Sequence, residues 1–199
     1  MTDDTKLQII RYPHPVLRHK SKPLRRVDAQ LLDWAHQMLD MMYEFRGVGL
    51  AGNQVNLPYR IFAMNPEAAS GSREHEMVLL NPVIVKRLGM AEAEEGCLSF
   101  PEIYAPVRRP DKVVISAYTL EGKELTMELD GFFARVVQHE TDHLDGITFI
   151  DRLSPAAKLS VKDRLESLEH QFHSGQEAGR IPSDQAIRER LERLEKERT

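Results

Sequence analysis

The sequence predicts an α+β fold in which antiparallel sheets surround a central metal-binding helix, with an N-terminal helix before it and a C-terminal helix after it. Several short apolar runs are separated by turn residues and lie too close together for helical crossovers, which favours antiparallel pairing. Apolar residues recur at helical spacing in other stretches of the chain. With 199 residues and 41% hydrophobic content, the chain can bury one core, so we expect one domain with a terminal extension.

The first third of the chain is predicted to be an extended arm followed by one helix. Three prolines within residues 11–24 disfavour a helix there. Asp28 is a suitable N-cap for a helix with an apolar face, and Gly47 would end that helix. The run GVGLAGNQV (47–55) is rich in glycine, so we expect a loop in which the backbone closely approaches another group.

Strands and a second helix are predicted for the middle of the chain. The expected strands are residues 59–64, 77–87, 113–120 and 124–129. Residues 131–144 are expected to form a core helix with one inward stripe. The members of that stripe are Phe132, Val136, His139 and His143.

The last part of the chain is predicted to be a helix followed by a charged extension. Ser154 and Pro155 suit the N-cap and first position of the helix. The stretch SGQEAGRIPS (174–183) interrupts the pattern, so we divide the chain into a main domain, 1–173, and an extension, 174–199. The extension is expected to be a solvated helix or a frayed, partly disordered end.

Charge and terminal composition narrow the class of protein. The net charge of −4 gives no global reason to bind DNA or RNA, although a local basic patch remains possible. The N-terminus lacks the features of a signal or transit peptide, and no apolar run approaches membrane-spanning length. We therefore expect a cytoplasmic protein that engages neither DNA nor a membrane.

The run QHETDHLDG (138–146) carries the clearest chemical signal. His139 and His143 are four residues apart, so on a helix both imidazoles can bind one metal ion while Glu140 reaches a nearby water. This arrangement indicates a metallohydrolase. Such a site needs a third protein ligand and an open coordination position.

Cys97, the only cysteine, is the candidate third ligand. It cannot form an internal disulfide, so its thiol is structural, reactive or metal-bound. One thiolate and two neutral imidazoles would leave a divalent ion with a net charge of about +1 and a position for water, as in catalytic centres. The alternative is a small buried hydrophobic residue, and the residues around Cys97 do not exclude it.

Three runs in order, GVGLAGNQV (47–55), EEGCLS (94–99) and QHETDHLDG (138–146), resemble the signature motifs of the peptide deformylase family. The resemblance covers about residues 7–172. It implies that Cys97, His139 and His143 hold one divalent metal ion, natively Fe(II), with Zn, Ni or Co able to replace it.

The resemblance also implies an activity, which is removal of the formyl group from N-formylmethionyl nascent peptides with release of formate. Glu140 would accept a proton from the attacking water and return it to the leaving nitrogen. The side-chain amide of Gln54 and the backbone N–H of Leu98 would stabilise the oxyanion. Family members are thought to dock on the ribosome near its exit tunnel through the C-terminal helix, so the ribosome is an expected partner.

A substrate peptide is expected to lie beside the backbone of the glycine-rich run, with its methionine in an apolar pocket. The predicted substrate-binding residues are Val48, Gly49, Leu50, Glu95, Phe132 and Val136. Glu95 is also expected to pair with Arg109. Two residues depart from the family pattern: Gly52, which could loosen the loop that holds Gln54, and Arg135, which could alter the pocket rim.

Two other functions fit part of the sequence. A zinc peptidase could use His139, His143 and a carboxylate, Glu166 or Glu169, as ligands, but Cys97 would then have no role. A peptide-binding module with an inactive centre would need neither Glu140 nor the oxyanion donor, although both are present.

Overall fold

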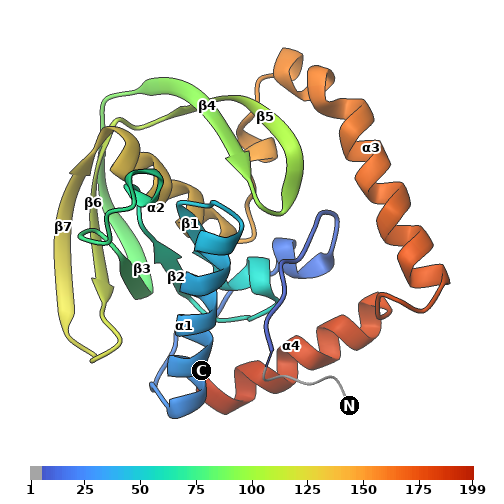
Figure 1. Cartoon of the computed structure of the whole chain (residues 1–199), viewed down its shortest axis with the longest axis horizontal. Helices are drawn as coiled ribbons and strands as arrows, with labels where there is room; N and C mark the ends of the chain where they lie inside the picture. The colour runs from blue at the N-terminus through green and yellow to red at the C-terminus, as the bar shows by residue number, and fades with distance from the viewer. Residues whose placement is uncertain (1–5) are drawn as a thin grey trace.

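A computed structural model describes residues 6–199 and confirms the α+β fold with antiparallel sheets. One sheet has five strands in the order β1-β2-β3-β6-β7, and a separate pair is formed by β4 and β5 (Figure 1). The strands are β1 (Gly49–Ala51), β2 (Ile61–Met64), β3 (Met77–Leu88), β4 (Ala91–Cys97), β5 (Phe100–Arg109), β6 (Lys112–Tyr118) and β7 (Glu124–Asp130). The helices are α1 (Ala29–Glu44), α2 (Gly131–Leu144), α3 (Pro155–Glu177) and α4 (Asp184–Arg198).

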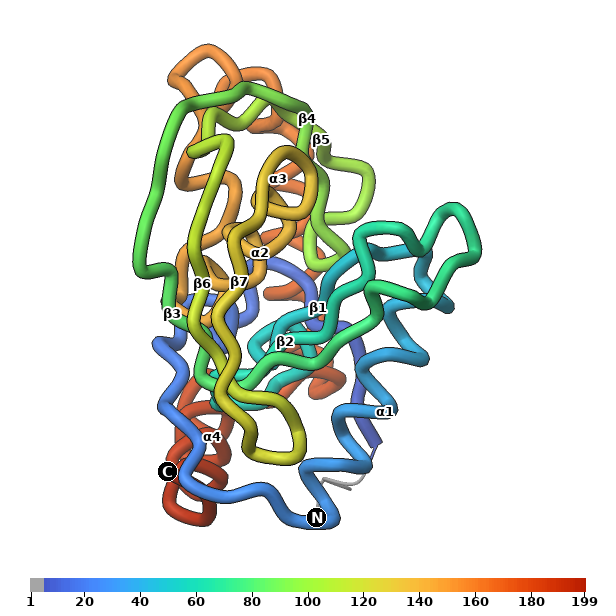
Figure 2. The backbone as a smooth tube through the Cα atoms, turned by 90° about the vertical axis from the view of Figure 1, so that its left-hand side faces the viewer, coloured from blue at the N-terminus to red at the C-terminus, as the bar shows by residue number. Residues whose placement is uncertain are grey.

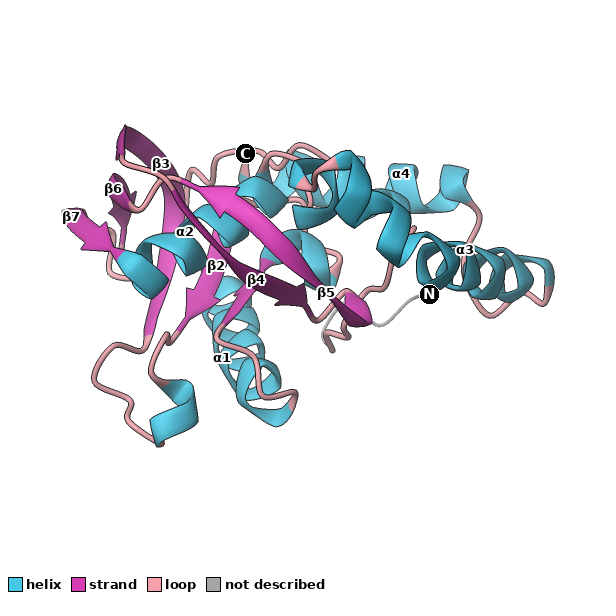
Figure 3. Ribbon diagram, turned by 90° about the horizontal axis from the view of Figure 1, so that it is seen from above, coloured by secondary structure: helices cyan, strands magenta, loops and turns pink. Residues whose placement is uncertain are grey.

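Helices α1 and α2 cover opposite faces of the five-stranded sheet. Because successive side chains of a strand alternate between its faces, Ile61 and Ala63 join the cluster that contains α1, whereas Phe62 and Met64 join the cluster that contains α2. Seen from above, α3 and α4 lie at the end of the molecule opposite β7 (Figure 3). Helix α2 is thus enclosed by protein, and it carries the HETDH run.

The predicted strands at 59–64, 77–87, 113–120 and 124–129 agree with β2, β3, β6 and β7 to within a few residues. Strands β1, β4 and β5 were not predicted. Strand β1 has only three residues, and β4 has the sequence AEAEEGC, in which residues 92–94 are exposed. Neither carries the apolar alternation from which a strand is predicted, because long-range pairing decides their conformation.

The N-terminal segment is packed more closely than an extended arm. It contains a short 3-10 helix, Pro15–Arg18, whose Val16 and Leu17 are fully buried. The Ile10 N–H donates to the Gln54 carbonyl at 2.7 Å, and the Tyr12 N–H donates to the Ser99 carbonyl at 3.0 Å. The segment therefore contacts both the glycine-rich run 47–55 and the EEGCLS run 94–99 rather than only crossing the surface.

The C-terminal residues form helix α4, which is one of the two expected forms, but one side of this helix is buried rather than solvated. Helix α3 begins at the predicted Pro155 but continues past residue 174 to Glu177. Helix α4 then buries Ile187, Leu191 and Leu194, each only 2% exposed, against the N-terminal segment and the core. The helical period brings these three residues onto one stripe. The division of the chain at 173/174 remains a prediction.

The predicted helix starts are confirmed by their caps. The Asp28 side chain accepts from the Leu31 N–H at 2.9 Å and so caps α1. Ser154 caps α3 in the same way through the Ala157 N–H. Across residues 6–199, no helix combines the length and the apolar character that crossing a membrane requires.

Candidate metal and substrate site

Three candidate ligands converge at the end of β4 and on α2. The ligand atoms of Cys97, His139 and His143 all lie within 4.8 Å of one another, and the Cys97 Sγ is 3.3 Å from the His143 Nε2. The His139 Nδ1 contacts the Glu95 Oε2 at 2.9 Å, which leaves the other ring nitrogen for a metal. The predicted triad is therefore brought together.

This donor set fits a divalent metal ion. A thiol and two imidazoles are ligands that Fe, Co, Ni and Zn all accept. Burial lowers the pKa of His143 well below its ordinary value of 6.5, so its ring is neutral, as a ligand must be. Burial also lowers the pKa of His139, but contacts with Cys97 and Glu95 outweigh burial and raise it to about 10.

Glu140 lies against the backbone of the glycine-rich run. A Cβ atom added to Gly49 would lie 2.3 Å from the Glu140 Oε1, so only glycine leaves room for this carboxylate. The Glu140 Oε2 is buried and has no hydrogen-bond partner among the described residues. Burial raises the pKa of Glu140 to about 7, which is suited to accepting and returning a proton near neutral pH.

The Gln54 side chain is oriented toward the candidate ligands. Its Oε1 accepts from the Ala51 N–H at 2.8 Å, which turns the amide nitrogen toward the Cys97 Sγ at 3.2 Å and the Ser99 Oγ at 3.4 Å. The backbone carbonyl of Gln54 accepts from the Ile10 N–H. These contacts fix the amide so that its N–H groups face the site.

Gly52 does not leave this loop loose. A Cβ atom at this position would lie 2.9 Å from the Tyr59 carbonyl oxygen, so the backbone of the neighbouring segment approaches too closely for alanine without a shift. The Gly52 carbonyl accepts from the Leu57 N–H at 2.9 Å. Glycine here follows from close packing, and the hydrogen bonds of Gln54 remain intact.

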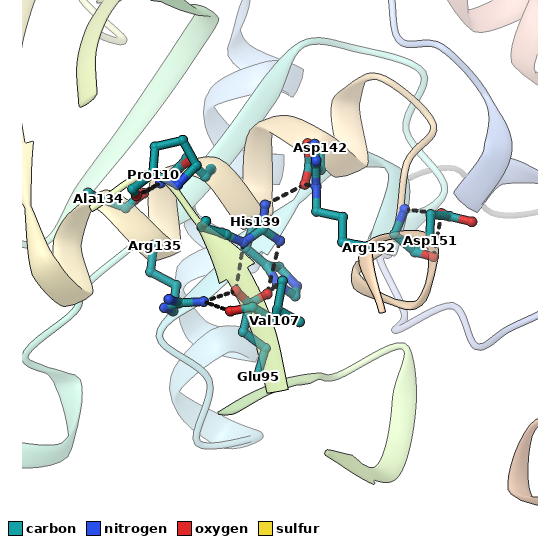
Figure 4. A network of polar contacts seen from close by, with 12 residues as sticks. Glu95, Val107, Pro110, Ala134, Arg135, His139, Asp142, Asp151 and Arg152 are labelled. Carbon is teal, nitrogen blue, oxygen red and sulfur yellow. Dashed lines mark hydrogen bonds and ion pairs between the residues drawn. The ribbon is translucent and has the colours of Figure 1, made fainter. Parts of the chain in front are cut away.

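Glu95 is the centre of a buried ionic network beneath the ligands (Figure 4). Both oxygens of Glu95 pair with Arg109, at 2.6 and 2.9 Å, which confirms the predicted pair. Arg135 donates to the Glu95 Oε1 at 2.6 Å and to the Val107 carbonyl at 2.9 Å. Although burial opposes it, hydrogen bonds from His139 and Arg109 hold the pKa of Glu95 well below its usual range.

The network continues to the protein surface through Asp142. Arg109 donates to the Asp142 Oδ2 at 2.6 Å, and Arg152 pairs with both oxygens of Asp142. Sequence reasoning missed Asp142 and Arg152, and it singled out Arg135 as a residue of the pocket rim without identifying Glu95 as its partner. Asp142 could have been suspected, because it lies within the HETDH run on the face beside His139, but nothing in the sequence identifies its partners.

A cavity of about 540 Å³ opens beside the ligands and contains most of the predicted substrate residues. Its lining includes Val48, Gly49, Gln54, Glu95, Cys97, Leu98, Phe132, Val136, His139 and Glu140. Leu50 is not among them, because its side chain is fully buried in the core. Phe132 is 53% exposed at the rim and so does not belong to an inward stripe.

Strand β1 forms one edge of the five-stranded sheet, next to this cavity. It pairs with β2 through Gly49, Leu50 and Ala51. Within the described chain, no sheet partner lies on its other side. An edge strand offers backbone donors and acceptors to an added peptide, so Leu50 can contribute its backbone while its side chain stays in the core.

The peptidase alternative does not agree with the structure. Glu166 lies on α3 and pairs with Lys162 at 3.4 Å, and Glu169 accepts from the Tyr12 hydroxyl. The one group of candidate metal ligands found among the described residues is Cys97, His139 and His143. The thiol, rather than a carboxylate of α3, completes the set.

The fold and this site define a class of hydrolase in which one thiol and two imidazoles fit a divalent metal ion. The sequence model of the polypeptide deformylase family matches residues 6–159. The chain belongs to this family, and it is a metallohydrolase that removes the N-formyl group from nascent peptides.

Relatives with the same name cover most of the chain. A peptide deformylase of Rhodopirellula baltica is 48% identical over 181 residues, which is 91% of this chain and 90% of that protein. The chloroplastic peptide deformylase 1B of Oryza sativa is 42% identical and matches 83% of this chain and 62% of its own length. A plant deformylase crystal structure superposes with a TM-score of 0.82 at 38% identity and covers 92% of this chain and 98% of that one.

Proposed function

We propose that Cys97, His139 and His143 together hold one divalent metal ion, natively Fe(II), with Zn, Ni or Co able to replace it. The convergence of these three side chains, beside a cavity that Cys97, His139, Glu140 and Gln54 line, is the observation that carries the proposal. When bound, such an ion supplies a Lewis acid that activates water and polarises the formyl group.

Glu140 is the proton carrier. It takes a proton from the attacking water, whose oxygen adds to the formyl carbon. The proton then passes to the methionine nitrogen as the C–N bond breaks, so formate and a free amine are released. The unpartnered Oε2 and the pKa of about 7 support this role, because the same group must accept and donate at neutral pH.

Gln54 and Leu98 stabilise the oxyanion that develops on the formyl oxygen. The Gln54 amide is already held toward the site, and Leu98 directly follows Cys97 in the same cavity. The peptide extends along the free edge of β1, beside Val48, Gly49 and the Leu50 backbone. The methionine side chain fits between Val48, Val136 and the rim formed by Phe132 and Glu95.

Two substitutions test these roles. Glu140→Gln should lower formate release from a formyl-methionyl tripeptide by roughly 10²- to 10⁴-fold, the usual contribution of a positioned general base. Gln54→Ala should lower it by about 10²- to 10³-fold, as loss of one oxyanion donor does. Both variants should retain the metal after anaerobic purification. Glu92→Gln, an exposed position on β4, is the matched control, and unchanged turnover of Gln54→Ala would remove Gln54 from the mechanism.

We also propose that the protein works in the cytoplasm close to the ribosome exit tunnel, where formylated chains first become accessible. Co-sedimentation with ribosomes tests this location. The C-terminal helix cannot be assessed by deletion, because α4 buries Leu194 in the core. Charge substitutions on the exposed face of α4 are the appropriate variants, and unchanged co-sedimentation would exclude docking through this helix.

A further inference from the structure

The charge of this chain is distributed very unevenly. Residues 5–27 contain no Asp or Glu but seven of the 27 Lys and Arg residues, whereas all 31 acidic residues lie elsewhere. Five of these cations are concentrated in the run RHKSKPLRR (18–26), which we name the basic ribbon. A K/R-rich run of this length is a candidate contact for a polyanion, and its structure decides whether the charges are available.

The backbone of the basic ribbon is held rigidly along the outside of the molecule. The N–H groups of Ser21, Lys22 and Arg25 donate to the carbonyls of Leu144, Pro58 and Arg198, each at 2.9 Å. These partners belong to three separate parts of the fold. Figure 2 shows the segment running down the outer edge of the molecule, past α4, toward the start of α1. The ribbon is thus preorganised by the fold.

The side chains of the basic ribbon divide into buried anchors and exposed cations. Ser21 and Leu24 are buried, at 2% and 7% exposure. Lys20, Lys22 and Arg25 are exposed. The exposed cations do not follow a single strand alternation, because Leu24, two residues after Lys22, is buried. Lys20, Lys22 and Arg25 therefore form a cluster of exposed cations within six residues of the chain.

The central cations are not neutralised by neighbouring carboxylates. At the ends of the ribbon, Arg18 pairs with Asp151, and Arg26 lies 3.8 Å from Asp28. Between them, Lys20, Lys22 and Arg25 form no ion pair with any described residue. Helix α4 differs, because its five basic and five acidic residues balance each other.

We propose that the basic ribbon binds the phosphodiester backbone of RNA through Lys20, Lys22 and Arg25. A cluster of exposed cations without ion-pair partners among the described residues complements the closely spaced phosphates of a nucleic acid. The ribbon contains no Phe, Tyr or Trp on which bases could stack, so the contact is independent of base sequence. An anionic membrane is less suitable, because the ribbon turns its apolar Leu24 inward. The choice of RNA rests on the action of the protein on nascent chains.

Fluorescence anisotropy with a labelled 16-nucleotide poly(U) RNA tests the proposal on the full-length, metal-loaded protein. Three phosphate contacts predict that affinity falls roughly 20-fold between 50 and 200 mM KCl. The triple variant K20E/K22E/R25E should lose at least about tenfold in affinity at 50 mM KCl, because each phosphate contact contributes to binding. The matched control K158E/R188E/K196E changes the net charge equally at exposed positions of α3 and α4, and it should lose much less.

Formate release from a short formyl-methionyl peptide provides an independent readout. It should be unchanged in both triple variants, since none of these residues lies in the catalytic cavity. If the wild type bound RNA but released no formate, the proposed function would be contradicted, whereas the proposal that the basic ribbon binds RNA would still hold. The neutral variant K20Q/K22Q/R25Q guards against an effect of charge reversal on folding and should also weaken binding.

Three outcomes would overturn the proposal. Equal losses in the ribbon and control variants would show that only net charge matters. Affinity that does not change with salt would exclude phosphate contacts. Binding to vesicles of phosphatidylglycerol and phosphatidylcholine, lost in K20E/K22E/R25E, together with absence of RNA binding, would assign the ribbon to a membrane surface instead.

Discussion

Helices α2 and α4 both carry many charged residues, but they use charge in different ways. In α2, residues Ala134 to Leu144 are all buried. Asp142 pairs with Arg109 and Arg135 pairs with Glu95 inside the protein, whereas the Glu140 Oε2 has no hydrogen-bond partner among the described residues. In α4, charges face solvent, and the buried exception is Arg198, at 7% exposure. Arg198 pairs with Asp28 at 3.0 Å and lies over the Trp34 ring at 4.8 Å. The ion pairs of α2 orient the candidate metal ligands, whereas those of Arg198 hold the C-terminal helix against the core.

This difference predicts how the two buried arginines respond to replacement. Removing Arg109 leaves the buried Glu95 with one fewer compensating charge. Removing Arg198 leaves Asp28, whose side chain is 30% exposed, so water can solvate its charge. Arg109 should therefore matter for both stability and metal binding. Arg198 should matter for stability alone.

The largest effect is expected for Arg109→Met. Glu95 keeps Arg135 and His139 as partners, and Asp142 keeps Arg152, so the loss should be about 3 kcal/mol, the lower end for a broken buried pair. Urea denaturation of the metal-loaded protein measures it, and competition with a chelator should show weaker metal retention. The control is Arg108→Met, whose side chain points to solvent on the adjacent position of β5. Equal stability of the two variants would contradict the importance of the network.

Acid should lower stability through two buried groups, His14 in the N-terminal segment and Glu95 beneath the candidate ligands, in different pH ranges. Burial lowers the pKa of His14, which packs on Phe172 of α3, from 6.5 to about 4. The unfolded chain therefore binds a proton below pH 6.5 that the folded protein refuses, so stability falls by up to about 1.4 kcal/mol per pH unit between pH 6.5 and 4. Above pH 6.5 neither the folded nor the unfolded state protonates His14, so the stability no longer changes with pH through this residue.

Glu95 responds at lower pH because the pKa of this carboxyl is held below its ordinary 4.5. Its contribution to stability is present above pH 4.5 and is lost as the pH falls further. Unfolding free energies measured from pH 7 to 4 for the wild type and His14→Asn should separate the two. The His14 Nδ1 accepts from the Val16 N–H at 3.3 Å, and the side-chain oxygen of asparagine can replace this acceptor. The variant should lose the decline between pH 6.5 and 4.5. An unchanged profile would show that His14 is not responsible.

A smaller effect is expected for Arg198→Met. The variant loses the Asp28 pair, a hydrogen bond to the Tyr59 hydroxyl and the contact with Trp34, together about 2 kcal/mol. Formate release at 25 °C should be unchanged, because Arg198 is outside the cavity. Arg188→Met, on the exposed face of α4, is the control. A loss of metal in Arg198→Met would break the distinction between the two helices.

The smallest effect is expected for Arg152→Ala at the outer end of the network. Its side chain is 39% exposed, and Asp142 retains Arg109, so the loss should be about 0.5 kcal/mol. Thermal unfolding measures it. A loss as large as that of Arg109→Met would mean that the network depends on its surface end rather than on its buried centre.

Local patterns carried much of the prediction. Helical spacing and caps located α1, α2 and the start of α3, because those signals lie within a few residues of one another. The His139, Glu140 and His143 spacing indicated a metal helix for the same reason. The missed elements depend on distant partners: β4 is a strand because β5 pairs with it, and Arg135 is buried because Glu95 faces it.

The sequence by itself determined the chemistry of this protein: a thiol, two imidazoles and a carboxylate, in motifs whose order and spacing are those of deformylases. Only the tertiary structure decided which charges are buried and paired and which remain available. Glu95, Arg109 and Asp142 come from three elements that are distant in sequence, and α4 returns to the N-terminal segment. Burial and pairing depend on the three-dimensional neighbours of a side chain, and those neighbours are set by packing of the whole chain.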